Sequence, residues 1–210
     1  MQDSNLARRA MVDNQLRPQG VTDRGVLAAM GKVERERFAS GQGVAFAYFD
    51  RPLPIGQGRF MMPPAALGRL LSDLAPRAGE RALVIGSGTG YSAAILRETG
   101  VEVVALESDA TLAEAAINAG VETTVGDLSK GCAKSAPFDI ILVDGAIEQF
   151  PQTLAAQLAP DGRFAGAIAE RGVTRLVSGR ISNGALALRS VADADVAPLP
   201  GFERPRAFTF

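Results

Sequence analysis

The chain has 210 residues, 47% of them hydrophobic and 21% charged, with a formal net charge of −1. This composition supplies a globular core, and the interspersed charges exclude a dedicated nucleic-acid or membrane surface. The absence of histidine excludes His-based triads and the usual zinc sites, and a single cysteine, Cys132, excludes an intramolecular disulfide. The N-terminal residues are polar and no apolar run is long enough to span a membrane, so we expect a cytoplasmic protein. The sequence predicts no bound metal and does not indicate an oligomeric state.

Helices are predicted in the first 75 residues, on both sides of an irregular stretch. Leu6–Leu16 has helical spacing and ends before Pro18. A second helix starts after Thr22, which we expect to be its N-cap. Residues 35–58 are predicted to be irregular, and a third helix covers Ala65–Leu74. We therefore expect an N-terminal helical extension, residues 1–75, on a core formed by residues 76–210 of a single domain.

Strands alternate with helices after Pro76. Strands are predicted at 82–85, 101–106, 121–125, 140–143 and 164–168, and helices at 91–99, 112–119 and 152–158. This alternation is typical of a Rossmann-like α/β fold, a doubly wound and mostly parallel sheet with helices on both faces. Segments 174–181 and 185–191, joined at Asn183-Gly184, predict an antiparallel C-terminal hairpin at the sheet edge.

A glycine-rich turn follows the first core strand. The segment Ile85–Tyr91 leaves that strand and opens a helix, and its glycines let a ligand approach bare backbone. Glu107 ends the next strand, about 20 residues later, where an acid can accept hydrogen bonds from ribose hydroxyls. Strand, turn, helix, strand and acid in this order predict a nucleotide-type ligand.

The spacing of the glycines favours one class of ligand. A dinucleotide turn has the form Gly-x-Gly-x-x-Gly, but here the third glycine, Gly90, comes one residue early, and Tyr91 takes its place. Gly-x-Gly-x-Gly is the form found with S-adenosyl-L-methionine. Asp127 ends the third strand and could hydrogen-bond the adenine amino group, although acids in such turns are often structural. Asp144 follows the fourth strand at the carboxyl edge of the sheet, where it could equally cap a turn. The predicted cofactor-binding residues are Gly86, Ser87, Gly88, Gly90, Tyr91, Glu107, Asp127 and Asp144.

Segments along most of the chain resemble one family. They are Met11-Val12, Gln15-Leu16-Arg17, Val26–Met30, Tyr48–Gly56, Ile85–Ala94, Val125-Gly126-Asp127, Phe138-Asp139 and Leu158–Arg163. Together they resemble the protein-L-isoaspartate O-methyltransferases, class I S-adenosylmethionine-dependent enzymes of protein repair. The resemblance implies methyl transfer to the free carboxylate of L-isoaspartyl residues in a protein or peptide. Since a carboxylate is ionised at neutral pH, that reaction needs positioning rather than a general base.

The sequence departs from the family where the substrate would bind. After Ile-Gly-x-Gly the family has Gln-Thr-Ile-Ser, and its Thr and Ser hydroxyls contact the reacting carboxylate. Here Arg59 begins this stretch, and Phe60 and Met62 replace the two hydroxyl residues. Arg59 could hold a carboxylate or be a solvated loop charge, and the apolar residues could pack under the N-terminal helices. Val84 also replaces a family acid that supports the cofactor's amino group, so we expect weaker cofactor binding and low isoaspartyl activity.

Two alternatives to an active methyltransferase remain at this stage. The chain could be a non-catalytic protein that keeps the fold and binds a cofactor or a partner. It could also be an NAD-type oxidoreductase, but Tyr91 and the lack of an evident proton relay disfavour this hypothesis.

Overall fold

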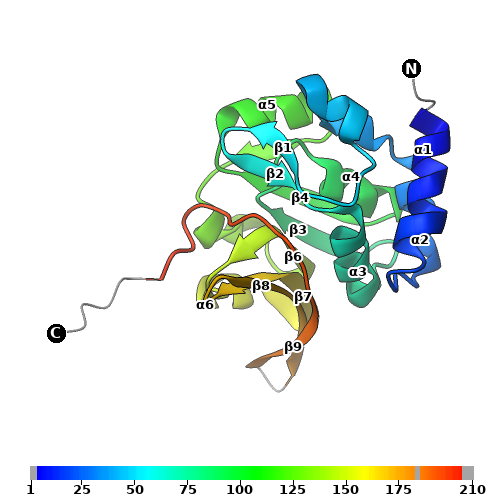
Figure 1. The fold of residues 1–210 in the computed structure, drawn as a ribbon. Coiled ribbons are helices and arrows are strands. Elements are labelled where there is room, and N and C mark those ends of the chain that lie inside the picture. Colours follow the sequence, from blue (N-terminus) through cyan, green and yellow to red (C-terminus); the bar gives the residue numbers. More distant parts are fainter. Residues whose placement is uncertain (1–3, 183–184, 205–210) are drawn as a thin grey trace.

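A seven-stranded sheet organises the fold, with its strands in the order β5-β4-β3-β6-β7-β8-β9 (Figure 1). The computed structural model describes residues 4–182 and 185–204. The sheet strands are β3 (Arg81–Ile85), β4 (Glu102–Glu107), β5 (Thr123–Val125), β6 (Phe138–Ile147), β7 (Leu158–Glu170), β8 (Val173–Ser182) and β9 (Ala185–Asp193). Strands β3 to β7 pair in parallel, whereas β8 is antiparallel to both β7 and β9. The predicted fold class is confirmed; the predicted turn at Asn183-Gly184 lies outside the described residues.

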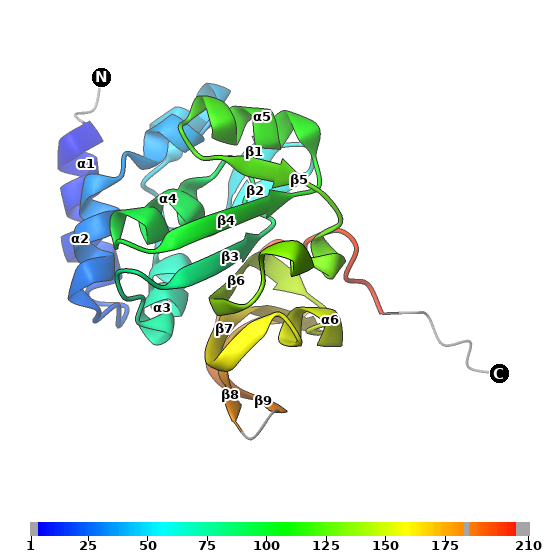
Figure 2. The ribbon, with the colours of Figure 1, turned by 180° about the vertical axis from the view of Figure 1, so that it is seen from behind.

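Most of the helices lie on one side of this sheet. They are α1 (Ser4–Met11), α2 (Arg24–Lys32), α3 (Pro64–Leu74), α4 (Tyr91–Glu98), α5 (Ala110–Asn118) and α6 (Gln152–Ala155). A π-helical turn (Val12–Leu16) extends α1, and short 3-10 helices cover Arg35–Phe38, Gly41–Phe46, Leu128–Lys130 and Ala133–Ser135. Figure 2 shows α1 and α2 grouped beside α3 and α4, so the N-terminal extension packs on the helical layer.

Alternation along the central strands separates two buried clusters. On β3, Val84 faces the cluster formed with the N-terminal extension, α3 and α4, whereas Leu83 and Ile85 face the opposite one. This is the two-residue period of a strand covered on both faces. The second cluster is completed by α6 and by Leu199 of the segment after β9. That segment, orange to red in Figure 1, returns across the sheet and bridges β6 through Ala146 and Pro198.

The order of the strands creates a crevice at their carboxyl ends. The chain runs outward from β3 through β4 to β5, and then crosses to β6 on the other side of β3. Ligands of open α/β sheets bind at such a reversal. Ile85 pairs with Val143, so the glycine turn after β3 lies level with Asp144 on β6. The topology therefore brings the predicted site residues of both strands to one edge.

The structure corrects several predicted elements. The stretch expected to be irregular contains a separate antiparallel pair, β1 (Leu53–Gly56) and β2 (Arg59–Met61). Asp23, rather than Thr22, caps α2, because its carboxylate accepts the Val26 amide at 2.9 Å. The helix predicted to reach Leu158 ends at Ala155, and β7 already begins at Leu158 with a register shift against β6. Asp144 lies inside β6 rather than after it.

No helix in the described part of the chain combines the length and the apolar character needed to cross a membrane.

Candidate cofactor site

The glycine turn has the backbone that the sequence predicts. Gly86, Gly88 and Gly90 have φ angles of +71°, +55° and +98°, a region that L side chains rarely adopt. A Cβ atom at Gly90 would approach the Val121 side chain to 3.0 Å, so glycine also allows close packing there. The turn is anchored to the neighbouring strand, because the Gly86 amide donates to the Leu106 carbonyl at 2.9 Å.

Glu107 lies beside this turn as a fully buried carboxylate. Its Oε2 accepts the Gly88 amide at 2.8 Å, and its Oε1 accepts the Ser108 and Asp109 amides at 2.7 and 3.1 Å. These backbone donors hold the charged form of the acid away from water. Glu107 therefore has the fixed position at the end of β4 that the ribose role predicts.

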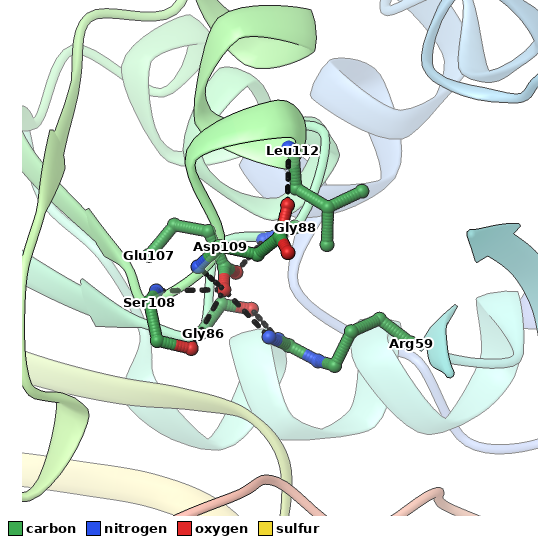
Figure 3. Close-up of polar contacts among 7 residues, drawn as sticks. All are labelled: Arg59, Gly86, Gly88, Glu107, Ser108, Asp109 and Leu112. Carbon is green, nitrogen blue, oxygen red and sulfur yellow. Dashed lines mark hydrogen bonds and ion pairs between the residues drawn. The ribbon is translucent and has the colours of Figure 1, made fainter. Parts of the chain in front are cut away.

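Arg59 reaches this carboxylate from β2 (Figure 3). Its Nη1 lies 2.6 Å from Glu107 Oε1, and its Nη2 donates to the Gly86 carbonyl at 3.0 Å. Only 6% of the Arg59 side chain is exposed. The interpretation of Arg59 as a solvated loop charge is therefore wrong: the guanidinium is buried inside the predicted cofactor site.

Asp144 adds a second buried acid on β6. Ser92 donates to its Oδ2 at 2.5 Å, whereas Oδ1 has no hydrogen-bond partner within the described residues. Burial raises the pKa of Asp144 to about 6, against the opposing effects of the Ser92 hydrogen bond and of the Arg59 and Arg35 charges. The Ser87 hydroxyl is likewise buried and lacks a partner there. Both atoms keep a hydrogen-bonding capacity that a polar ligand could use once the side chains beside the glycines move.

The Asp144 carboxyl should make stability depend on pH. The unfolded chain ionises it near pH 4, whereas the folded protein keeps its proton until about pH 6. The folded state thus binds more protons in this window, and its stability falls as the pH rises. Asp144→Asn cannot ionise, so its unfolding free energy relative to the parent should increase by about 2 kcal/mol between pH 4 and pH 7. Urea unfolding across this range measures the difference; a difference that does not change with pH would contradict the buried acid.

Two other predicted residues have structural roles. Asp127 caps the 3-10 helix Leu128–Lys130, where its carboxylate accepts the Ser129 amide at 3.0 Å. The Ser129 hydrogen bonds, and then the one from Lys130, lower the pKa of Asp127. The Tyr91 ring packs against Phe38, with centroids 5.6 Å apart, and so lies at the junction with the N-terminal extension. A role for either residue in cofactor binding stays a prediction.

The predicted substrate loop divides between the surface and the core. The Phe60 side chain is 38% exposed, while Met61 and Met62 are buried in the cluster with the N-terminal helices. Arg35 fixes the loop from beneath, because its Nη2 donates to the Met62 carbonyl and its Nε to the Ala47 carbonyl, both at 2.6 Å. The packing interpretation therefore holds for Met61 and Met62, and Phe60 remains exposed beside them.

The site offers the right groups for S-adenosylmethionine, but the chain's own side chains fill it in this conformation. Glu107 and the partnerless polar atoms of Ser87 and Asp144 suit a ligand with hydroxyl and amino groups. A Cβ placed on Gly88, however, would lie 2.7 Å from Ile55 Cδ1, and one on Gly86 would lie 2.8 Å from Leu199 Cδ1. The space beside the glycines is thus taken by Ile55, Leu199 and Arg59.

Two residues of this region, Arg35 and Leu199, are not predicted from the sequence. Arg35 stands in a charged run, Glu34-Arg35-Glu36-Arg37, that is typical of a solvated surface, although its side chain is fully buried. Leu199 lies in a segment without helix or strand periodicity. No local signal distinguishes either residue, because both reach the site through contacts between distant segments.

Comparison with known proteins identifies the relatives of this chain. The sequence model of the family described as Protein-L-isoaspartate(D-aspartate) O-methyltransferase matches residues 7–199. A Protein-L-isoaspartate O-methyltransferase of Methylorubrum populi is 41% identical over 167 residues, which cover 77% of this chain and 79% of the relative. One of Koribacter versatilis is 35% identical over 203 residues, covering 93% and 91%.

Solved structures agree in fold. A protein-L-isoaspartate O-methyltransferase structure superposes with a TM-score of 0.80 at 21% identity, covering 92% of this chain and 66% of that one. A putative enzyme of the same description from Plasmodium falciparum, in complex with S-adenosyl-L-homocysteine, gives a TM-score of 0.75 at 21% identity and covers 91% and 97%.

Proposed function

Because the chain belongs to the protein-L-isoaspartate O-methyltransferase family, we propose that it transfers a methyl group from S-adenosylmethionine to the carboxylate of L-isoaspartyl residues in proteins or peptides. The observation that carries this proposal is Glu107, a buried acid at the end of β4 beside a glycine turn of the Gly-x-Gly-x-Gly form. Family membership favours this activity over a non-catalytic protein or an NAD-dependent oxidoreductase.

The residues of the crevice have distinct roles in this proposal. Glu107 would accept the ribose hydroxyls, and the bare backbone of Gly86 and Gly88 would border the amino-acid tail of the cofactor. Ser87 and Asp144 contribute polar atoms that have no partner within the described chain. When bound, the cofactor supplies a methyl group activated for displacement.

The acceptor needs orientation rather than activation. A substrate carboxylate is ionised at neutral pH, so the protein has to align one oxygen with the methyl group and exclude water. Phe60 and Met62 stand at the positions where the family has the two hydroxyl residues that orient the carboxylate, and neither side chain donates a hydrogen bond. We therefore propose slow turnover with isoaspartyl substrates.

Methyl incorporation tests the proposed function directly. The protein, radiolabelled S-adenosylmethionine and an isoaspartyl peptide should give slow incorporation, and the matched peptide with a normal aspartyl residue should give none above background. Glu107→Ala should weaken cofactor binding by on the order of 1–3 kcal/mol and lower the signal at limiting cofactor, because the ribose loses its acceptor. Equal labelling of both peptides, or labelling of neither at saturating cofactor, would contradict isoaspartyl methyl transfer.

A further inference from the structure

The Arg59–Glu107 pair uses an acceptor that the cofactor needs. Glu107 Oε1 already accepts the Ser108 and Asp109 amides as well as Arg59 Nη1 (Figure 3). A carboxylate oxygen offers about two lone-pair sites, but Oε1 already has three N–H donors and the Ser108 hydroxyl at 3.2 Å, so a ribose hydroxyl can bind it only by displacing one of them. A ribose presents two hydroxyl donors side by side and engages both oxygens of such an acid. The guanidinium and the ribose therefore compete for the same atom.

Arg59 cannot keep its buried position when a ligand binds to Glu107. Its side chain is almost completely buried, and Glu107 is the acid with which it forms an ion pair. A buried charge that loses its partner is strongly unfavourable, so the guanidinium has to leave for water or for another anion. The movement of Arg59 is thus a condition for cofactor binding.

The element that carries Arg59 is suited to such a movement. It lies on β2, which within the described residues pairs with β1 alone and forms no hydrogen-bonded ladder with the seven-stranded sheet (Figure 1). Its position over the glycine turn therefore depends on its side chains: Leu53, Ile55 and Met61 pack in the core cluster, and Arg59 pairs with Glu107. Ile55, on the same hairpin, covers Gly88, so one displacement of β1 and β2 removes two of the side chains that fill the crevice.

We infer that Arg59 is an internal ligand of the cofactor site, which holds the β1–β2 hairpin closed over the glycine turn until the cofactor displaces it. The inference rests on the proposed function, because it concerns the same cofactor. Its consequence is an apparent affinity reduced by the fraction of molecules that are open. Arg59 is a positioning residue in this scheme, since it acts through Glu107 and the hairpin.

Calorimetry with S-adenosylhomocysteine tests the competition. This ligand lacks the sulfonium charge, so removal of a nearby cation has little direct effect on its binding. Arg59→Gln should bind it about tenfold more tightly than the parent, which corresponds to a parent that is open in about one molecule in ten. Arg59→Lys keeps the charge but loses the forked geometry, and should lie between the two.

Arg81→Gln is the matched control, because it removes the same charge far from the glycine turn. Arg81 lies at the start of β3, whereas the turn follows the end of that strand, and the Arg81 side chain is 40% exposed. This variant should leave the dissociation constant unchanged. Hydrogen exchange without ligand gives a second readout: Arg59→Gln should speed exchange at residues 53–61, and Arg81→Gln should not.

The outcomes separate the two proposals. If the parent binds S-adenosylhomocysteine and both Arg59 variants bind it equally or more weakly, Arg59 does not compete and the inference is wrong, while the proposed function stands. If neither the parent nor any variant binds, the proposed function fails and the inference fails with it.

Discussion

Glu107→Ala should lower the free energy of unfolding by about 4 kcal/mol, the typical cost of removing one partner from a buried ion pair. The structure gives the reason: the substitution leaves the Arg59 guanidinium buried without its carboxylate, and it also removes the acceptor of the Gly88, Ser108 and Asp109 amides. Urea unfolding at pH 7 measures the loss. Cofactor binding should weaken by on the order of 1–3 kcal/mol in the same variant.

Two further variants show whether the loss comes from the ion pair. Adding Arg59→Met to Glu107→Ala removes the orphaned charge and should restore on the order of 1–2 kcal/mol, because deleting both partners costs less than deleting one. Glu102→Ala, at the exposed end of the same strand, should change stability by less than about 0.5 kcal/mol. A double variant no more stable than Glu107→Ala would show that the unpaired charge is not the main cost.

Phe60→Thr combined with Met62→Ser should raise isoaspartyl turnover by about a hundredfold. The change restores the two hydroxyls that the family uses to orient the carboxylate, and a positioning hydrogen bond in a desolvated site is worth on the order of 3 kcal/mol. Met62 is buried, so its replacement should also lower stability by about 2–4 kcal/mol. Methyl incorporation at saturating cofactor, measured well below the melting temperature, checks the gain.

The matched control has the same shape without hydroxyls: Phe60→Val combined with Met62→Ala. It opens the loop by a similar volume but donates no hydrogen bond, so its turnover should stay near that of the parent. Equal gains in the two double variants would show that space, rather than hydrogen bonding, limits the reaction. A parent that already turns over isoaspartyl peptide rapidly and selectively would show that the hydroxyls are dispensable.

The sequence predicts the sheet and the glycine turn well because both depend on local patterns. Apolar runs of strand length, helical periodicity and a turn of alternating glycines determine β3, α4 and β4, and with them the position of Glu107. The sequence does not predict the hairpin β1–β2, because its two strands are short and contain Pro54 and Gly56, residues typical of loops.

The partners inside the site could not be predicted in this way. Arg59 and Glu107 are 48 residues apart, and Leu199 meets Gly86 only because the segment after β9 returns to β6. Such contacts depend on the tertiary fold, whereas rules based on residue spacing describe only local structure. The sequence therefore predicts an acid in the cofactor site, and the structure shows an arginine of the same chain paired with it.

The buried Arg35 has a consequence for exchanging loops between relatives. One guanidinium holds the carbonyls of Ala47 and Met62 and lies over the Tyr91 ring at 4.6 Å, so three segments share a single anchor. The backbone path of residues 59–62 is therefore not a property of those residues alone. A substrate loop transplanted into or out of this protein should keep its shape only in a host that also supplies the arginine and the aromatic ring beneath it.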